Sequence, residues 1–379
     1  MEKKKLLMVT PYFYPKIGGL ENYAFNISKG LKEKYNWEIV VITSNHENTG
    51  YQEETINGIK IYRLPRWFKV SNTPINPMWY WQIKDIIKKE NPNVINAHSP
   101  VPFIADMAAK AAKSLGIPFV LTYHNDLVKE NPILNTIIKI FYFLLGNKTI
   151  RISTQIIATS QFYADSSTYL KEYKNKISIV SPGTYLPKEA KVKQLKNTIL
   201  FVSQLDKTHR HKGLNYLIGA IAEVKKEIKD LQLIICGKGN DLDYYRELVN
   251  KFNLQDNITF KGFVKDSELS NLYFACTALI LPSTTNAEGF GMVLVDAMAH
   301  KRPVIGTNVG GIPHLIENNK NGLLVSKKNT EELSKAIIKV LKDKTIAKKM
   351  GIFGYNKVKG SFTWDIQVKN TNKILLSLI

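Results

Sequence analysis

The chain has 379 residues, which at roughly 100–200 residues per domain argues for two domains. Apolar residues make up 44% of the chain and charged residues 22%, close to the average for globular proteins, so disorder is excluded as the dominant state. Lys and Arg outnumber Asp and Glu by 53 to 32, a formal net charge of +21. This excess is consistent with a protein that binds nucleic acid, an anionic membrane surface or phosphorylated substrates. A generally lysine-rich composition explains it equally well.

Neither the cysteines nor the N-terminus indicates secretion. Cys236 and Cys276 cannot build a disulfide framework and lack a zinc-binding spacing, so we expect a reducing compartment. The apolar run Leu6–Val9 ahead of Pro11 is too short for the core of a signal peptide. No window reaches the roughly 20 apolar residues that a spanning helix needs. We therefore expect a cytoplasmic protein.

Strand and helix patterns alternate in the first half of the chain. Helical spacing of apolar residues is found at 20–31, 79–89 and 104–115. Short apolar runs between these segments predict buried strands, and the alternation predicts βαβ units around a parallel sheet. The predicted strands are Leu6–Thr10, Glu38–Thr43, Val94–Ala97, Phe119–Tyr123 and Gln155–Ala158.

The same alternation restarts near Asn197, after a polar linker within 184–197. We expect a Rossmann-like domain over 1–186, a second one over 187–360, and a helix within 361–379. The helices predicted in the second domain lie at 213–228, 241–253, 291–300 and 330–342. Its predicted strands are Ile199–Ser203, Gln232–Cys236, Ile258–Lys261, Ala278–Pro282, Pro303–Thr307 and Gly322–Val325.

The strongest functional signal is the segment Pro282–Ala299, where a polar loop delivers Glu288, Gly289 and Gly291 ahead of an apolar helix. Glycines let backbone N–H groups approach a ligand, and a helix N-terminus favours phosphate. Asp296 follows Glu288 by eight residues, about two helical turns, so both acids would lie toward one face. Acids in this arrangement suit sugar hydroxyls. The alternative is that they only cap and decorate a surface helix.

This segment resembles the E-x7-E signature of the retaining glycosyltransferases of family 4. The resemblance implies the GT-B fold, an α/β architecture of two Rossmann-like, doubly wound parallel-sheet domains facing across a cleft. It also implies that the C-terminal helix crosses back to the first domain. The other matching segments, in the family's order, are Gly18–Glu21, Thr122–His124, Phe201–Leu205 with Lys212–Gly213, Phe260–Phe263 and Gly310–Pro313.

The sequence departs from the family pattern at several points. The second acid is Asp296 instead of Glu, which puts the implied ribose contact in doubt, and neutral Gln204 stands where the family often has arginine. The segment Ser181–Thr184 retains only part of the usual P-N-G turn. The loop from Gln204 to Lys212 is longer than usual and contains His209, Arg210 and His211. Arg210 either replaces the missing arginine or is simply solvent-exposed.

The resemblance implies that the second domain holds a sugar linked to UDP or GDP. Glu288 would accept hydrogen bonds from the donor sugar, and Lys212 would neutralise the leaving diphosphate, where charge accumulates as the glycosidic bond breaks. An ordinary exposed lysine is the alternative for Lys212. Base recognition is expected near Phe263–Lys265. The remaining implied donor contacts are Gln204, Arg210, Phe263, Val264, Gly289, Phe290, Gly291, Met292, Val293 and Asp296.

In the first domain, the resemblance implies that Gly18 and Gly19 close against the diphosphate. Acceptor contacts are expected from Tyr12, Tyr14, Glu21 and His124. His124 is also the third expected catalytic residue beside Lys212 and Glu288. Strand ends line ligand crevices in open α/β sheets, although a single histidine or glycine pair is often structural. We expect no cofactor and no metal, since we see no Asp-x-Asp motif suited to a divalent cation. The implied reaction retains the anomeric configuration, with the leaving phosphate as the base.

Residues 132–145 are dense in large apolar side chains, with basic residues around them at Lys129, Lys139, Lys148 and Arg151. The segment is too short to span a bilayer and suits a helix at the membrane interface, or else a helix in the domain core. An interfacial helix would place the protein at the cytoplasmic face of the membrane. The expected acceptor is a hydroxyl of a glycan or lipid-linked molecule in cell-surface polysaccharide, glycolipid or glycoprotein glycan assembly.

Two other classes of protein compete with this interpretation. Nucleic-acid binding would use the positive charge, but the lysines are dispersed and no basic motif is interleaved with aromatic residues, so we expect no nucleic-acid partner. A non-catalytic subunit that binds sugar nucleotides stays open because Gln204 and Asp296 depart from the family pattern.

Overall fold

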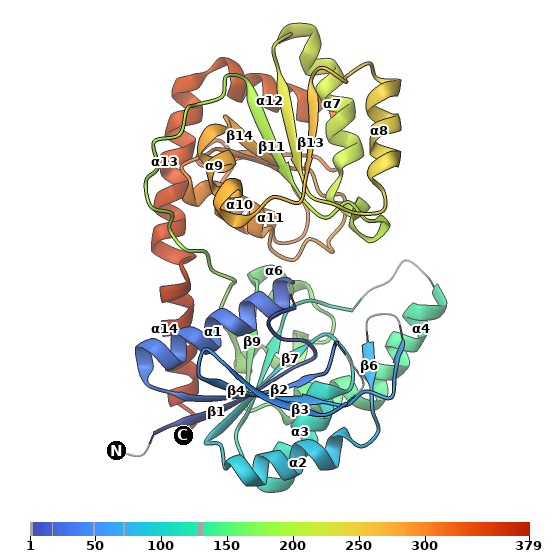
Figure 1. Cartoon of the computed structure of the whole chain (residues 1–379), viewed down its shortest axis with the longest axis vertical. Helices are drawn as coiled ribbons and strands as arrows, with labels where there is room; N and C mark the ends of the chain where they lie inside the picture. Colours follow the sequence, from blue (N-terminus) through green and yellow to red (C-terminus); the bar gives the residue numbers. More distant parts are fainter. Residues whose placement is uncertain (1–2, 17, 48–49, 71–72, 128–131) are drawn as a thin grey trace. The chain divides into compact units, whose positions relative to one another are not determined.

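The computed structural model describes residues 3–16, 18–47, 50–70, 73–127 and 132–379 (Figure 1). The chain divides into two compact units, each built on a mainly parallel sheet with helices on both faces, in agreement with the predicted α/β class. Unit 1 consists of Met1–Gly183 and Trp364–Ile379, and unit 2 of Thr184–Thr363. These divisions lie three residues from the predicted boundaries at 186/187 and 360/361.

The sheet of unit 1 has eight strands in the order β10-β9-β8-β7-β1-β2-β4-β3, and all neighbours are parallel except β3 and β4. A separate antiparallel pair, β5–β6, follows β4. The strands are β1 (Lys5–Thr10), β2 (Glu38–Ser44), β3 (Gln52–Ile56), β4 (Ile59–Leu64), β5 (Phe68–Val70), β6 (Thr73–Ile75), β7 (Val94–Ser99), β8 (Phe119–Tyr123), β9 (Gln155–Ala158) and β10 (Ile177–Ile179).

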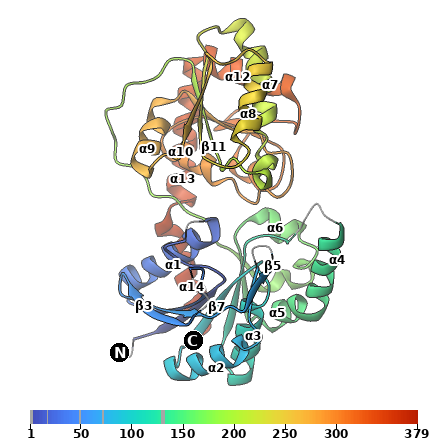
Figure 2. The same ribbon diagram turned by 45° about the vertical axis from the view of Figure 1, so that its right-hand side comes forward.

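Helices cover both faces of this sheet, which is why its central strands are apolar on both sides. Leu6 and Met8 belong to a buried cluster with residues of α1 and α14, whereas Leu7 and Val9 belong to one with residues of α2 and α3. The four helices are labelled in Figures 1 and 2. The helices of unit 1 are α1 (Gly19–Tyr35), α2 (Trp79–Glu90), α3 (Ile104–Leu115), α4 (Pro132–Phe141), the π-helical η1 (Tyr142–Gly146), α5 (Asn147–Ile152), α6 (Gln161–Ser166), the 3₁₀ helix η2 (Lys171–Lys176) and α14 (Trp364–Leu376).

The C-terminal helix α14 is part of unit 1, as we expected from the family resemblance. It packs against α1, where a Cβ on Gly30 would lie 2.4 Å from Cγ2 of Val368, so the two backbones approach closely. The buried Trp37 indole donates a hydrogen bond to Asn372 Oδ1 at 2.8 Å. These contacts give the helix a specific register on the first unit.

Unit 2 has a six-stranded parallel sheet in the order β13-β12-β11-β14-β15-β16. The strands are β11 (Thr198–Val202), β12 (Gln232–Cys236), β13 (Ile258–Gly262), β14 (Ala278–Leu281), β15 (Val304–Thr307) and β16 (Gly322–Val325). The helices are the 3₁₀ helix η3 (Lys207–Lys212), α7 (Leu214–Glu227), α8 (Leu242–Lys251), α9 (Asp266–Ala275), α10 (Met292–Ala299), α11 (Ile312–Leu315), α12 (Thr330–Lys342) and α13 (Lys344–Ser361). The loops after β11, β13 and β14 carry the predicted donor-binding residues.

Candidate functional site

Lys212 is placed by a tight approach of two loops in unit 2. The residue ends η3, and Gly213 follows it with φ +79°. A Cβ at Gly213 would lie 2.0 Å from the carbonyl oxygen of Pro282, so only glycine fits there. The backbone N–H of Thr284 also donates to the carbonyl of His211 at 2.7 Å. Together these contacts hold η3 beside the loop that connects β14 to α10.

Lys212 and Glu288, two of the predicted catalytic residues, form an ion pair. The Lys212 ammonium donates to Glu288 Oε2 at 2.6 Å, and the Ser283 hydroxyl donates to the same oxygen at 3.0 Å. Glu288 is buried. Burial alone would raise the pKa of its carboxyl, but the Lys212 charge and both hydrogen bonds hold that pKa below its ordinary value. Glu288 is therefore ionised, and the ion pair places a carboxylate and a cation at the start of the glycine-rich loop.

Two further glycines, Gly310 and Gly311, pack closely against the backbone of the loop that carries Glu288. A Cβ on Gly310 would lie 2.0 Å from the Glu288 carbonyl oxygen, and one on Gly311 would lie 2.2 Å from that of Gly289. The Gly311 N–H donates to the Glu288 carbonyl at 2.9 Å. Thus the predicted Gly310–Pro313 motif acts as a platform for the loop before α10.

The helix after this loop begins at Met292, preceded by Gly291 with φ +91°. Met292 and Val293 therefore supply the first backbone amides of α10, where anions bind favourably. The side chain of Phe290 is buried against Phe362, with ring centroids 5.6 Å apart, so this residue can offer a ligand only its backbone. Glu288 precedes the helix instead of lying on it, so the two-turn spacing expected between the acids on one helix is wrong.

Asp296, the second acid of the signature, lies one turn into α10 and is partly buried. Its Oδ1 accepts a hydrogen bond from the Thr184 hydroxyl at 2.7 Å. Burial raises the pKa of Asp296 to about 6, although the Thr184 hydrogen bond lowers it. Thr184, from the partly retained P-N-G segment, thus occupies the carboxylate that was expected to contact a ribose.

Arg210 does not supply its charge to the Lys212–Glu288 pair. Its guanidinium donates to Asp241 Oδ2 and lies 4.3 Å from the centre of the Tyr244 ring, both on the side of α8. Gln204 is exposed after β11 and carries no charge. The structure therefore places the predicted arginine replacement in an ion pair of its own.

The predicted base-recognition loop follows β13. Phe263 is 67% exposed, and the Lys238 ammonium lies 5.5 Å from its ring centre. Val264 is buried in the core of unit 2. An exposed aromatic face beside a cation is suited to stacking against a planar ring.

In unit 1, the predicted glycine pair begins α1. Glu21 folds back so far that a Cβ on Gly18 would lie 2.2 Å from its Oε2, whereas Gly19 has open space around it. Burial raises the pKa of Glu21, an effect that the Lys16 charge opposes. Tyr12 is buried under the Lys16 ammonium, 3.0 Å from the ring centre. Tyr14 is exposed and stacks on Phe25 with centroids 4.9 Å apart.

His124 lies at the end of β8 and contacts a second histidine that sequence reasoning missed. His98 Nδ1 and His124 Nε2 are 2.9 Å apart, and Tyr23 packs edge-on against both rings. Burial lowers the pKa of His124 to about 3 and that of His98 well below its usual range. Both rings are therefore neutral near pH 7. The signal for His98 was its position directly after the predicted strand 94–97.

The segment 132–145 forms α4 and η1, and one side of it faces solvent. The exposed fractions are 55% for Ile137, 53% for Ile140, 78% for Phe143 and 50% for Leu144. Ile138 and Tyr142 on the opposite side are buried in unit 1. Lys139, Lys148 and Arg151 are exposed, whereas Lys129 lies outside the described residues. The helix is thus neither a fully buried core helix nor an isolated one.

The expectation that this segment is too short to span a bilayer is wrong. Gly146 and Asn147 have helical backbone angles, so the helix continues through η1 and α5 to Ile152. In the part of the chain that the structure describes, Ile133–Ile152 has 20 residues and is long and apolar enough to cross a membrane by length and composition. One such helix is weak evidence for a span, because composition alone decides it.

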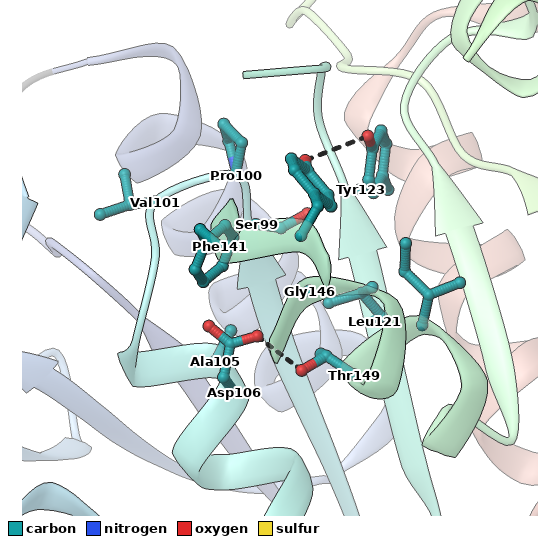
Figure 3. A pocket seen from close by; sticks show the side chains of 12 residues that line it. Ser99, Pro100, Val101, Ala105, Asp106, Leu121, Tyr123, Phe141, Gly146 and Thr149 are labelled. Atoms are coloured by element: carbon teal, nitrogen blue, oxygen red, sulfur yellow. Dashed lines mark hydrogen bonds between the residues drawn. The ribbon is translucent and has the colours of Figure 1, made fainter. Parts of the chain in front are cut away.

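The inner side of this helix is fixed to unit 1 through Asp106 (Figure 3). Asp106 Oδ1 accepts from the Thr149 hydroxyl at 2.5 Å. Its Oδ2 accepts from the Phe103 N–H at 2.8 Å. Asp106 and Thr149 border a cavity of about 20 Å³, lined also by Tyr123 and Gly146, which has room for about one water molecule. Thr149 thereby ties α5 to the start of α3.

Within the described ranges, no three His, Cys, Asp or Glu side chains gather in a way that could hold a metal ion. The two cysteines are free and buried.

Comparison with known proteins gives matches in both units. The family described as Glycosyltransferase Family 4 matches residues 17–186, and the family described as Glycosyl transferases group 1 matches residues 186–357. An uncharacterised glycosyltransferase of Methanocaldococcus jannaschii is 29% identical over 371 residues, which cover 98% of this chain and 97% of the relative. The N-acetyl-alpha-D-glucosaminyl L-malate synthase of Bacillus anthracis is 25% identical over 354 residues, which cover 89% of this chain and 88% of the relative.

Among solved structures, Anabaena HepE in complex with UDP superposes with a TM-score of 0.75 at 18% identity, covering 98% of this chain and 100% of that chain. At this identity, the likeness shows the fold alone. The two family matches together span both units, from residue 17 to residue 357.

Proposed function

Because the chain belongs to family 4 of the glycosyltransferases and has the GT-B fold, we propose that it transfers a sugar from UDP or GDP to a hydroxyl of a glycan or lipid-linked acceptor, with retention of configuration. The observation that carries this proposal is the Lys212–Glu288 ion pair at the start of a glycine-rich loop and helix. It combines a cation for phosphate, a carboxylate for sugar hydroxyls and the first backbone amides of a helix in one place.

In the proposed reaction, the acceptor oxygen bonds to the anomeric carbon while the bond from that carbon to the phosphate oxygen breaks. The electron pair stays on the leaving diphosphate, which also takes the proton of the acceptor hydroxyl. Departure and attack on one face retain the configuration. Lys212 exchanges its contact with Glu288 for one with the diphosphate and stabilises the developing charge. Glu288 then accepts from the hydroxyls of the donor sugar.

His124 serves this reaction as a neutral group. With a pKa of about 3, its ring is neutral near pH 7, so it hydrogen-bonds a hydroxyl instead of giving up the proton of an imidazolium. Its Nε2 contacts His98, which leaves Nδ1 as the ring nitrogen for a ligand. A positioning contact with the sugar is the role that suits such a ring.

The proposed reaction uses no metal and no cofactor. Lys212 and the first amides of α10 supply the positive charge that a divalent cation supplies in other enzymes. Addition of EDTA is therefore expected to leave donor binding unchanged.

We place the protein at the cytoplasmic face of a membrane through 132–145. Support comes from the exposed apolar side of α4 and η1 together with Lys139 and Lys148, because apolar burial and attraction to anionic lipid add at the interface. The buried opposite side, with Tyr142 in the core, favours a helix lying on the membrane over one crossing it. Acceptors in glycolipid, glycoprotein glycan or cell-surface polysaccharide assembly fit this location.

A non-catalytic subunit that binds sugar nucleotides is the second candidate. Asp296 is engaged by Thr184, and Arg210 is engaged by Asp241, so two of the implied donor contacts already have partners inside unit 2. Donor binding without any release of nucleoside diphosphate would favour this candidate.

The test is the thermal stability of the purified protein with UDP- and GDP-sugars in the presence of EDTA. At about 100 times its Kd, a ligand of the folded state adds about 2.7 kcal/mol of apparent stability. We expect a shift with one nucleotide class that is lost in Lys212→Ala and Glu288→Gln. Lys335→Ala, which removes a surface ion pair with Glu331 in the same unit, is the matched control. No shift with any sugar nucleotide would contradict the proposal.

A further inference from the structure

A second group of positively charged side chains lies in unit 1, at the carboxyl edge of the sheet. Lys16 and Lys69 both point at Tyr12, with their ammonium groups 3.0 and 5.7 Å from the ring centre. Arg63 is the second-last residue of β4 and pairs with Thr43 of β2 in the sheet register. Arg66 follows two residues after β4. We call Lys16, Arg63, Arg66 and Lys69 the unit 1 basic cluster.

Arg63 is held rigidly and keeps one donor unused. The residue is 2% exposed, its Nη2 donates to the Tyr14 carbonyl at 2.6 Å, and its Nε donates to Glu54. Its Nη1 is buried and has no hydrogen-bond partner. Burying a guanidinium N–H without a hydrogen-bond partner is unfavourable, so such a group indicates that a ligand completes the site.

Side chains near Arg63 also have buried polar atoms that lack a hydrogen-bond partner. Arg66 Nε, His46 Nδ1 and Thr43 Oγ1 are also buried without a hydrogen-bond partner. Four of the nine such side-chain atoms found in the described part of the chain therefore lie at the ends of β2 and β4 or within two residues of them. This concentration on adjacent strand ends points to one ligand instead of four independent packing faults.

The charges around the cluster do not balance. Glu54 pairs with Arg63, and His46 Nε2 lies 4.0 Å from Glu47, but no acidic side chain in the described ranges forms an ion pair with Arg66 or Lys69. Burial lowers the pKa of Lys16, and the charges of Lys69 and Arg66 lower it further against the opposing effect of Glu21. Like charges are thus held close together with too few acids between them.

We propose that the unit 1 basic cluster is a binding site for a phosphate group of the acceptor. This inference rests on the proposed function, since it names the chemical class of the acceptor. Guanidinium groups match the oxygen geometry of a phosphate, and here one lies at the end of β4 and the other lies two residues beyond it, while two ammonium groups add charge. The carboxyl edge of a parallel sheet is where ligands of such folds bind.

The phosphate belongs either to a soluble phosphate ester or to a lipid headgroup. Glycerol 3-phosphate is the probe for the first, and vesicles of phosphatidylcholine with phosphatidylinositol are the probe for the second. Both are titrated at constant ionic strength into protein saturated with UDP or GDP, so that the nucleotide occupies unit 2. Arg66→Gln and Lys69→Gln are the test variants, because both side chains reach the surface.

Loss of one charge-assisted contact is expected to weaken phosphate binding by about 10- to 100-fold in Arg66→Gln and in Lys69→Gln. Lys171→Gln, which removes an exposed lysine elsewhere in unit 1, is expected to stay within about twofold of the wild type. An Arg66-dependent effect with glycerol 3-phosphate identifies a soluble ester. An Arg66-dependent effect with the vesicles alone identifies a lipid.

Equal binding by wild type and both test variants overturns the inference, and so does an equal loss in Lys171→Gln, which would reflect net charge only. The thermal transition of each variant checks its folding. If UDP and GDP fail to bind while phosphate binding still depends on Arg66, the proposed function fails and the phosphate site stands.

Discussion

The ion pair between Lys212 and Glu288 makes a quantitative prediction about stability. Lys212→Met removes the ammonium but keeps most of the apolar stem, and leaves Glu288 with Ser283 as its remaining side-chain partner among the contacts described. Breaking a buried pair from one side costs about 3–5 kcal/mol, since a buried charge loses its compensation. The Glu288 side chain is 6% exposed and that of Lys212 is 24% exposed, so we expect a loss near the lower end, about 3 kcal/mol.

The loss is expected to depend on pH with a defined sign. In the wild type the pKa of Glu288 is lowered, so its stabilisation is present above the ordinary value of 4.5 and disappears as the pH falls through the folded-state pKa. In Lys212→Met, burial is no longer opposed by the lysine, and the folded-state pKa rises. The stability of the variant therefore falls as the pH increases from the ordinary value of 4.5 through the raised folded-state pKa. The difference from the wild type is largest at neutral pH and shrinks in acid.

Urea unfolding followed by tryptophan and circular dichroism signals, from pH 4 to pH 8, measures this effect. The double variant Lys212→Met/Glu288→Gln removes both charges and is expected to recover most of the stability lost at pH 7. Lys335→Ala, at the exposed pair with Glu331, is expected to cost less than about 1 kcal/mol. A loss in Lys212→Met no larger than that of Lys335→Ala, or an equal loss at every pH, would refute the reasoning.

Three further predictions concern other parts of the chain. Asp296→Asn keeps an acceptor for the Thr184 hydroxyl and removes a carboxyl whose pKa is about 6 instead of 3.8, so that the wild type loses stability as the pH rises between these values. Thermal unfolding is expected to show a gain for the variant of up to about 3 kcal/mol at pH 7.5 and little gain at pH 4. Gly213→Ala costs at least about 2 kcal/mol because of its positive φ and the Pro282 carbonyl, whereas Gly360→Ala, with open space around its Cβ, is neutral or stabilising. Phe143→Glu reduces co-sedimentation with anionic vesicles at least about tenfold, and equal sedimentation would contradict the membrane assignment.

The fold was predictable where single segments carry a strong signal. The central parallel strands, such as Leu6–Thr10 and Ala278–Pro282, are buried on both faces and read as continuous apolar runs. Strand β3 was missed because Gln52–Ile56 is polar and half-exposed at the sheet edge, although Asn57-Gly58 after it is a hairpin signal. The continuation of the helix past Gly146 was missed because glycine ends many helices, yet here it packs beneath Tyr142.

The candidate site was predictable where the family motif lies in one continuous segment. Lys212, Glu288 and the glycines around them come from such segments, and the structure brings Lys212 and Glu288 together. The Arg210–Asp241 pair and the Thr184–Asp296 contact join residues that are 31 and 112 positions apart. The unit 1 basic cluster likewise depends on the register of β2 and β4 and on the approach of Lys16 to Tyr12. Contacts of this kind are set by tertiary packing, which no local pattern records.

The most direct measurement for the central claim is the release of nucleoside diphosphate from the sugar nucleotide that stabilises the protein most, in EDTA, with water in place of the acceptor. The wild type and Lys335→Ala are expected to release it at equal rates. Lys212→Ala, measured at a temperature where it is folded, is expected to be at least about 100-fold slower, because the leaving diphosphate has lost its cation. Release at the full rate by Lys212→Ala, or release by the wild type only after a divalent metal is added, would contradict the account.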